Sequence, residues 1–251
     1  MPSKVLGVIP ARFASSRFPG KALATLAGRP ILQHVHERAV QSRYLSKVII
    51  ATDDERIRDA ALSFGAAVRM TRPDHLSGTD RVAEAASAEE CSLVVNIQGD
   101  EPLIDPAAID AATLSLLDDQ TVPMGTLMKR IEHPEEIHSP HVVKVVRNRE
   151  GNAIYFSRCP IPHTREARVD GADTVYYKHI GLYVYRRDFL LSYSSLPVGP
   201  LELAERLEQL RALENGYPIR VVETEYESLG VDTPEDLAKV AALFAQSHLP
   251  I

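Results

Sequence analysis

Three cationic side chains are concentrated in one short segment near the start of the chain. Arg12, Arg17 and Lys21 lie in residues 10–21, directly after the apolar run 5–9, which we expect to be a buried strand. In open α/β sheets, ligands bind beyond the carboxyl ends of the strands. Arg and Lys at that place suit a polyphosphate, because their charge-assisted hydrogen bonds to phosphate are strong. The segment therefore favours binding of a nucleotide's phosphates; the alternative is an ordinary surface loop with a Pro-Gly turn.

Two better-known phosphate loops do not fit this segment. The Walker pattern G-x-x-x-x-G-K-[ST] fails because Ser15 stands in place of its first glycine and Ala22 follows the lysine. No G-x-G-x-x-G follows the first apolar run, which argues against a dinucleotide-binding fold of the usual kind. If the cationic loop binds phosphate, it therefore belongs to neither of these two classes of phosphate loop.

A carboxylate is expected at the same sheet edge. Asp100 lies in the segment 96–102, just after a second apolar run, and Gly99 would let the backbone approach a ligand closely. A carboxylate that faces phosphates is repelled unless a divalent cation lies between them, and Mg²⁺ is typically held by one or two carboxylates plus substrate phosphates. The alternative is that Asp100 caps a turn before Pro102.

A second carboxylate lies in the segment 230–236. Thr233 is a plausible helix N-cap and Pro234 suits the first helical position, so both have a structural explanation. Asp232 is not needed as the cap. It could be the second carboxylate on a metal ion, or it could simply be the residue that precedes the cap.

The segment 75–81 places small polar residues before an expected helix. The amides at a helix N-terminus could hold a base or a phosphate. Ser77 and Asp80 also fit a capping box, which would be a purely structural role.

Composition limits the class of protein. The chain has 251 residues, 45% hydrophobic and 25% charged, which is typical of a globular protein with one large or two small domains. The net charge of −6 argues against nucleic acid as a partner. Cys91 and Cys159 show neither metal-ligand spacing nor a disulfide framework. No apolar run reaches the ~18 residues of a membrane span, and the first one is too short for a signal peptide. We therefore expect a cytoplasmic protein that binds no membrane.

Strands and helices alternate through the first half of the chain. We expect strands at 5–9, 47–51, 66–70 and 92–97, and helices at 30–43, 55–64, 80–90 and 106–117. This alternation predicts an α/β fold with a mostly parallel, Rossmann-like sheet and helices on both faces. In the second half we expect strands at 142–146, 153–157 and 175–185, turns at 148–151 and 169–173, and helices at 201–214 and 234–246. We interpret residues 1–251 as one domain with an inserted, partly antiparallel lobe at about 125–215.

The motifs together resemble one family. P-A-R-x-x-S-S-R-x-P-G-K, S-G-T-D-R, N-x-Q-G-D-E-P, K-H-I-G-L-Y and G-V-D-T-P-E-D occur in this order between residue 5 and about residue 240. This pattern is similar to that of the 3-deoxy-manno-octulosonate cytidylyltransferases, or CMP-Kdo synthetases, which have the nucleotide-diphospho-sugar transferase type of fold. N-x-Q-G-D-E-P together with G-V-D-T-P-E-D is the specific part of the resemblance. Other sugar nucleotidyltransferases share the first loop more loosely.

The resemblance implies a homodimeric, Mg²⁺-dependent enzyme. Such an enzyme joins CMP from CTP to the anomeric hydroxyl of 3-deoxy-D-manno-octulosonate (Kdo), releases pyrophosphate and supplies CMP-Kdo for the lipopolysaccharide core. Matching positions imply the catalytic residues Arg12, Arg17, Lys21, Asp100 and Asp232, the last two as Mg²⁺ ligands. They imply a nucleotide site of Pro10, Ala11, Arg12, Arg17, Lys21, Ser77, Gly78, Arg81, Gln98 and Asp100. They imply sugar contacts from Gln98, Arg158, His179, Tyr183, Glu208 and Gln209. The resemblance also implies that the lobe at about 125–215 binds the sugar and forms the dimer contact.

The identity of the sugar stays open at this point. Residues 162–174 match the family poorly, and they border the expected sugar lobe. The substrate could instead be 8-amino-Kdo or a neuraminic acid. A nucleotide-binding sensor without catalysis is a further alternative, although a sensor would not need both Asp100 and Asp232.

Overall fold

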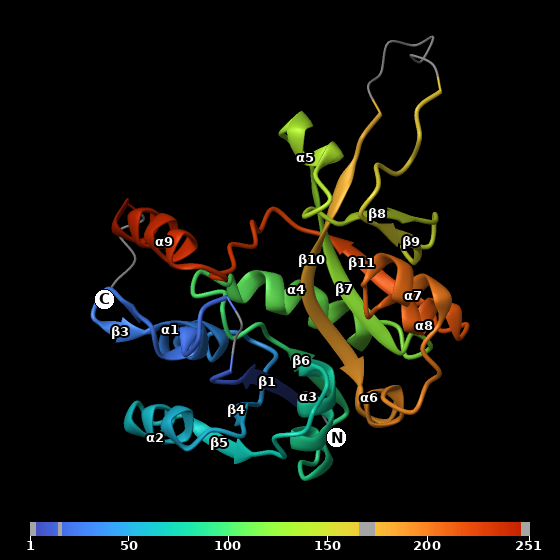
Figure 1. Ribbon diagram of the computed structural model, residues 1–251. Coiled ribbons are helices and arrows are strands. Elements are labelled where there is room, and N and C mark those ends of the chain that lie inside the picture. The colour runs from blue at the N-terminus through green and yellow to red at the C-terminus, as the bar shows by residue number, and fades with distance from the viewer. Residues whose placement is uncertain (1–3, 15–16, 166–173, 247–251) are drawn as a thin grey trace.

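The computed structural model describes residues 4–14, 17–165 and 174–246 (Figure 1). Ser15 and Ser16 of the first loop, and the expected turn at 169–173, lie outside the described residues. The strands of the main sheet are β1 (Val5–Ala11), β4 (Lys47–Thr52), β5 (Ala67–Met70), β6 (Leu93–Asn96), β7 (Met124–Arg130), β8 (Lys144–Arg147), β9 (Ala153–Ser157), β10 (Tyr177–Arg186) and β11 (Ile219–Glu223). A separate hairpin pairs β2 (Thr25–Leu26) with β3 (Arg29–Pro30).

The helices alternate with these strands. They are α1 (Ile31–Ala39), α2 (Glu55–Ser63), α3 (Gly78–Ser87), α4 (Pro106–Leu117), α5 (Pro134–His138), α6 (Arg187–Tyr193), α7 (Pro200–Glu205), α8 (Leu210–Glu214) and α9 (Pro234–Gln246), with a short 3-10 helix at Lys21–Leu23. Within the described part of the chain, none of them is long and apolar enough to cross a membrane.

The sheet has the strand order β11-β7-β10-β6-β1-β4-β5. β6, β1, β4 and β5 are parallel to one another, as the alternation of strands and helices predicted. β10 is antiparallel to both β6 and β7, and β11 runs parallel to β7. β8 pairs with β10 and with β9, both antiparallel, and forms a small extension at the far end of β10 (Figure 1). The α/β class with a partly antiparallel addition is thus confirmed; the role of 125–215 as a sugar-binding and dimerisation lobe stays a prediction.

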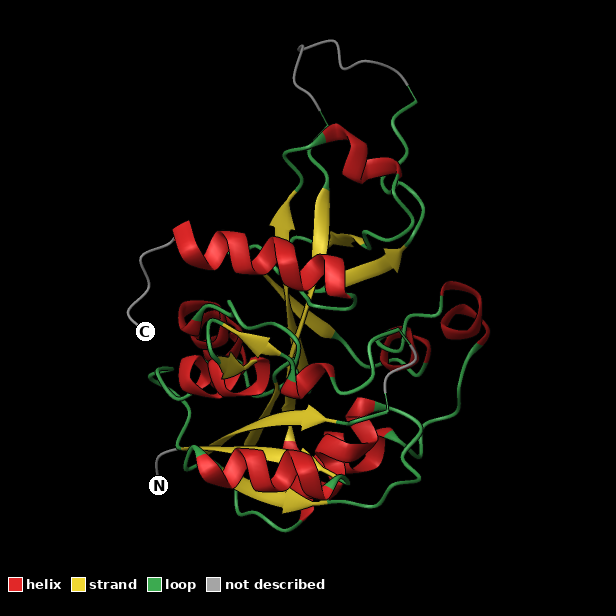
Figure 2. Ribbon diagram, turned by 60° about the vertical axis from the view of Figure 1, so that its left-hand side comes forward, coloured by secondary structure: helices red, strands yellow, loops and turns green. Residues whose placement is uncertain are grey.

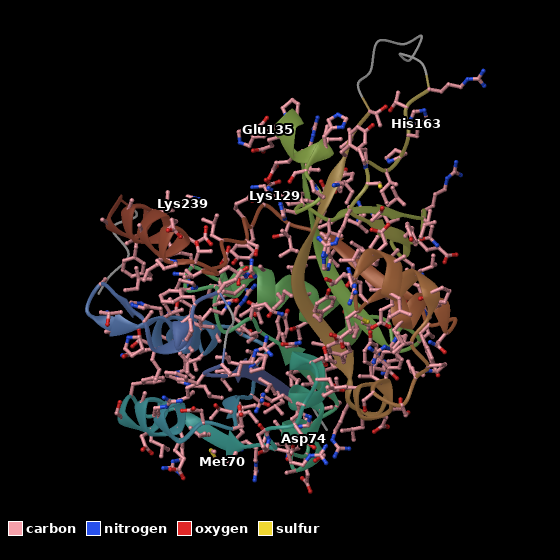
Figure 3. All side chains as sticks on the ribbon, in the orientation of Figure 1. Met70, Asp74, Lys129, Glu135, His163 and Lys239 are labelled. Atoms are coloured by element: carbon pink, nitrogen blue, oxygen red, sulfur yellow. The ribbon has the colours of Figure 1, made fainter. Side chains whose placement is uncertain are left out.

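Helices cover both faces of the sheet, and the alternation of side chains along β1 explains why (Figure 2). Val5 and Ile9 pack in the core that includes α1, α2, α4 and α9. Leu6 and Val8 pack in the core that includes α3, α6 and α8. Because both faces of the strand are buried, it is apolar at nearly every position. Charged side chains outside these two layers, such as Glu135 and Lys239, lie on the exposed outside of the molecule (Figure 3).

Three of the expected helices are wrong in extent. The helix expected at 80–90 begins at Gly78 and ends at Ser87. α1 ends at Ala39 rather than at 43, because the chain turns there and the Asp110 carboxylate accepts hydrogen bonds from the Ser42 hydroxyl and the Arg43 amide. The single helix expected at 201–214 is interrupted: α7 ends at Glu205 and α8 begins at Leu210. Arg206 takes a left-handed conformation with φ of 54°, which ends the first helix. The strands β7 and β11 and the helices α5 and α6 were not expected.

Candidate active site

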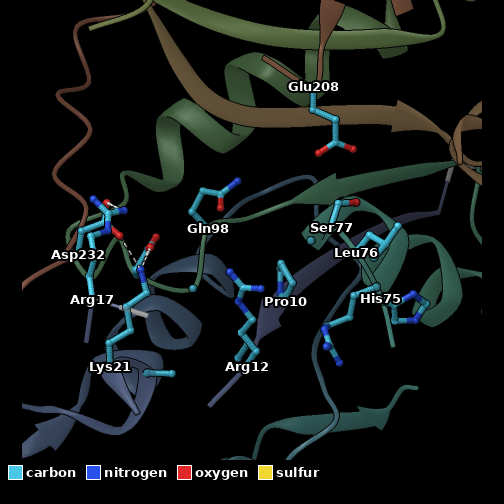
Figure 4. Close-up of a pocket in the computed structure, with 16 residues that line it drawn as sticks. Pro10, Arg12, Arg17, Lys21, His75, Leu76, Ser77, Gln98, Glu208 and Asp232 are labelled. Atoms are coloured by element: carbon cyan, nitrogen blue, oxygen red, sulfur yellow. Dashed lines mark hydrogen bonds and ion pairs between the residues drawn. The ribbon is translucent and has the colours of Figure 1, made fainter. Parts of the chain in front are cut away.

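A pocket of about 420 Å³ opens beyond the carboxyl ends of the parallel strands β1 and β6 (Figure 4). Its lining consists of Pro10, Ala11, Arg12, Arg17, Lys21, Ala22, His75, Leu76, Ser77, Gly78, Arg81, Gln98, Gly99, Asp100, Glu208 and Asp232. Every residue that the sequence assigned to the nucleotide or to the metal ion is among them. The fold thus brings these residues together from four separate segments, and their individual roles stay predictions.

Lys21 joins Asp100 and Asp232, two of the three carboxylates that line this pocket. Its ammonium group donates a hydrogen bond to Asp100 and another, of 2.9 Å, to Oδ1 of Asp232. Nη2 of Arg17 lies 2.8 Å from the other oxygen of Asp232. Burial lowers the pKa of Lys21, but the Asp100 and Asp232 carboxylates outweigh burial and leave the pKa above its ordinary value. Two carboxylates from distant parts of the sequence therefore share one cation (Figure 4).

Close approaches of the backbone join three of the loops that line the pocket, those after β1, after β6 and before α9. The amide of Val231 donates to the carbonyl of Asp100 at 2.8 Å, which joins the loop before α9 to the loop after β6. A Cβ on Gly99 would lie 2.8 Å from the carbonyl oxygen of Pro10, closer than real Cβ atoms come. Glycine is therefore required at this position for the β1 and β6 loops to meet.

The segment before α3 serves a structural role as well as lining the pocket. Ser77 Oγ accepts a hydrogen bond from the Asp80 amide at 3.1 Å, and the Asp80 carboxylate accepts one from the Ser77 amide, so the expected capping box is confirmed. Arg81 is 5% exposed, and its guanidinium lies 3.0 Å from Oδ1 of Asp53 and donates to the Thr71 hydroxyl. The guanidinium of Arg81 is thus already bound to other side chains at the edge of the pocket.

A second pocket, of about 160 Å³, adjoins the first. Its lining consists of Pro10, Gly78, Thr79, Asn96, Gln98, Tyr183, Tyr185, Tyr193, Glu208 and Gln209, four of which also line the first pocket. Within the described part of the chain, Oδ1 of Asn96, Oε1 of Glu208 and Nε2 of Gln209 are buried without a hydrogen-bond partner. Burial raises the pKa of the Glu208 carboxyl above its ordinary value. Three such atoms on residues that line one small pocket suit a polar ligand.

The break between α7 and α8 supplies part of this second pocket. Because Arg206 ends α7 in a left-handed turn, Glu208 and Gln209 precede α8 instead of continuing the earlier helix. The hydroxyl of Tyr193 donates to the carbonyl of Glu208 at 2.6 Å and holds this segment against α6. Sequence patterns did not point to Tyr193 or Tyr185. Thr79 lies in the S-G-T-D-R motif, within the segment 75–81 expected near the ligand, and Asn96 could have been found because it belongs to the N-x-Q-G-D-E-P motif.

Arg158 and His179 line neither pocket. The Arg158 guanidinium donates to the carbonyl oxygens of Glu205 and Pro140, at 2.7 and 2.8 Å. The His179 ring packs between Phe156 and Tyr183. Burial lowers the pKa of His179 to about 3. The contacts with the sugar implied for these two residues stay predictions.

Known proteins resemble this chain over its whole length. A family model described as cytidylyltransferase matches residues 6–225. The 3-deoxy-manno-octulosonate cytidylyltransferase of Solibacter usitatus is 71% identical over 249 residues, which cover 99% of this chain and 98% of that protein. The enzyme of the same name from Geobacter metallireducens is 54% identical over 244 residues, 94% of this chain and 96% of that protein. A solved structure of CMP:2-keto-3-deoxy-manno-octonic acid synthetase complexed with CTP superimposes with a TM-score of 0.92 at 46% identity, and the match covers 97% of this chain and 99% of that one.

Proposed function

The chain belongs to the cytidylyltransferase family, among the 3-deoxy-manno-octulosonate cytidylyltransferases, and from this premise we propose that it transfers CMP from CTP to the anomeric hydroxyl of Kdo and releases pyrophosphate. The observation that carries the proposal is the pair of adjoining pockets. One holds the cationic loop with Asp100 and Asp232, and the other holds three side chains that each have one polar atom without a partner. The first suits a nucleoside triphosphate, and the second suits the hydroxyl groups of a sugar.

The cationic loop would bind the triphosphate. Transfer of a phosphoryl group depends on positioning and on neutralisation of charge more than on covalent chemistry by the protein. Arg12, Arg17 and Lys21 line one pocket and together carry three positive charges (Figure 4). Their interactions with the leaving pyrophosphate would strengthen as negative charge develops on it during the reaction.

Asp100 and Asp232 would hold a magnesium ion. They fit this role because both already contact a single cation, the Lys21 ammonium group. In residues 4–14, 17–165 and 174–246 no three His, Cys, Asp or Glu side chains gather so as to hold a metal ion, so substrate phosphates would complete the coordination, as Mg²⁺ commonly requires. When bound, such an ion lowers the pKa of a coordinated hydroxyl and offsets the charge of a phosphate.

The sugar acid would occupy the second pocket. Asn96, Glu208 and Gln209 offer it hydrogen bonds that the protein leaves unmade. Gln98 lies where the two pockets meet, and its Nε2 donates to the carbonyl of Gly181 at 3.0 Å, which fixes the side chain. Because the two pockets adjoin, a sugar placed here would lie next to the triphosphate, as direct attack of its anomeric hydroxyl on the α-phosphorus requires.

Release of pyrophosphate tests this function. We expect the purified protein to release pyrophosphate from CTP and Mg²⁺ when Kdo is added, and to release none without a sugar acid. 8-Amino-Kdo and a neuraminic acid belong in the same panel, because a preference for either would replace Kdo as the substrate. CTP binding without turnover on any sugar acid would instead identify a nucleotide sensor.

We further propose that two copies of the chain form a homodimer and that the enzyme acts in the cytoplasm. Apolar side chains on β9 and α7 support the dimer: Ile154 and Leu203 are each 60% exposed, and both elements lie on the same side of the molecule (Figure 1). The cytoplasmic location rests on the nucleotide substrate, since CTP is a cytoplasmic metabolite. The product, CMP-Kdo, would enter synthesis of the lipopolysaccharide core.

A further inference from the structure

Glu101 is a buried carboxyl group beside the pocket, and the proposed chemistry does not use it. It is 7% exposed and follows Asp100 in the loop after β6. The hydroxyl of Tyr226 donates to its Oε2 at 2.7 Å, and the hydroxyl of Ser228 donates to its Oε1, also at 2.7 Å. Both carboxyl oxygens are therefore bound, although the two donors lie 125 and 127 positions away in the sequence.

These donors belong to the segment that leads to Asp232. Residues 224–233 connect β11 to α9 without regular secondary structure. Nζ of Lys129, labelled in Figure 3, donates to the carbonyl of Glu225 at 3.1 Å and lies 3.0 Å from the Glu227 carboxylate, which anchors the start of the segment to β7. Glu101 binds the middle of the segment through Tyr226 and Ser228. Near the end of the segment, the Val231 amide donates a hydrogen bond to the Asp100 carbonyl.

The two proposed metal ligands are thus attached immediately next to these contacts. Asp100 precedes Glu101 in the chain, and Asp232 follows Val231. The Asp232 side chain itself is 43% exposed, so packing around it does little to restrict its position. Hydrogen-bonded groups behind metal ligands set the orientation of those ligands, and their loss typically lowers metal affinity 10- to 100-fold.

We propose that Glu101, with Tyr226 and Ser228, is a positioning residue that sets the separation of Asp100 and Asp232 and thereby the affinity for the divalent cation. The inference rests on the proposed function, in which those two carboxylates hold the ion. Glu101 acts on the ion through its neighbours: its own two oxygens are occupied by hydroxyl groups, and it does not line the pocket.

The test separates metal affinity from nucleotide affinity. The double variant Tyr226→Phe, Ser228→Ala removes both hydroxyls and leaves every pocket residue in place. Mn²⁺ serves as the metal probe, with its binding followed by electron paramagnetic resonance in the presence of a non-hydrolysable CTP analogue. We expect Mn²⁺ affinity to fall about 10- to 100-fold. Binding of the analogue in excess EDTA should change by no more than about twofold, since no contact with the nucleotide is removed.

A conservative variant and a matched control identify positioning as the cause. Glu101→Leu removes both hydrogen bonds and should lower the metal affinity. Glu101→Gln keeps the size of the side chain and can still accept from one hydroxyl and donate to the other, so it should retain most of that affinity. Ser46→Ala removes a single hydrogen bond of similar length, from the Ser46 hydroxyl to the Val5 carbonyl at 2.8 Å, away from the pocket. It should lower thermal stability without changing Mn²⁺ affinity.

Two outcomes contradict different parts of the argument. The positioning role is overturned if the double variant binds Mn²⁺ as the wild type does, or no more weakly than Ser46→Ala. The proposed metal site itself fails if Asp100→Asn and Asp232→Asn leave Mn²⁺ binding unchanged. Loss of binding in these two variants but not in the double variant overturns the positioning role alone.

Discussion

Replacing Lys21 with methionine removes the ammonium group that lies between the two proposed metal ligands. In the structure this group contacts Asp100 and lies 2.9 Å from Asp232, so it occupies the place of the cation that the carboxylates would otherwise share. A divalent ion that enters without nucleotide must displace it. Lys21→Met should therefore raise the metal affinity of the nucleotide-free protein, although the same change removes a contact with CTP and should lower turnover.

The size of the gain follows from the two ion pairs. A charge-assisted hydrogen bond contributes about 1.5–3 kcal/mol net. The Lys21 and Asp100 side chains are 19% and 26% exposed, so this pair keeps most of that value. The Asp232 side chain is 43% exposed, and solvent screening reduces its pair toward the ~0–1 kcal/mol of surface ion pairs. A total of about 2 kcal/mol corresponds to a rise of roughly 30-fold in metal affinity, at 1.4 kcal/mol per tenfold.

Mn²⁺ binding without nucleotide measures this gain directly. Lys4→Met is the matched control, because it removes an ammonium group whose 3.5 Å ion pair with Glu90 lies on the surface. In EDTA the Lys21 variant should also melt at a lower temperature than the wild type, because Asp100 and Asp232 are left without the ammonium group. Added Mn²⁺ should raise the melting temperature of the variant and remove this difference. Equal or weaker Mn²⁺ binding by Lys21→Met would refute the reasoning, because the carboxylates would then not form a shared cation site.

Three further predictions test the site. Arg17→Ala should weaken the use of CTP roughly 10- to 150-fold in steady-state kinetics, because one charge-assisted contact is lost; unchanged CTP affinity would remove Arg17 from the phosphate site. Asp100→Asn and Asp232→Asn should each abolish most turnover, and the double variant should be little worse than either, since residues that act as a unit are not additive; near-normal activity of Asp232→Asn would leave Asp232 as a residue before a helix cap. The pKa of His179 is lowered from 6.5 to about 3, so below pH 6.5 the unfolded chain takes up a proton that the folded protein does not, and stability falls with pH. Denaturant unfolding should show a loss of at most about 2 kcal/mol from this group by pH 5, and His179→Gln should remove it; an unchanged slope would show that His179 already titrates normally.

Local signals in the sequence predicted the elements that carry the nucleotide site. The apolar runs at 5–9 and 92–97 form buried parallel strands, and the loops after them meet at one edge of the sheet. Such signals are reliable because a strand buried on both faces must be apolar throughout, and because a cap bonds to amides only three residues away. The capping box at Ser77 and the cap at Thr233, whose hydroxyl accepts from the Asp236 amide at 3.2 Å, are of this local kind.

Only the tertiary structure decided which distant groups meet and which side chains are left without partners. β7 lies between β10 and β11, with Met124 opposite both Tyr185 and Ile219, and no local pattern encodes pairings between such distant positions. The break at Arg206, which brings Glu208 into the lining of the second pocket with Asn96, lies in a stretch with helical character on both sides. The sequence alone likewise indicated that Lys21 binds phosphate, whereas the fold places its ammonium group between two carboxylates. Contacts of this kind depend on how several loops converge, because their energy arises only once the whole sheet has formed.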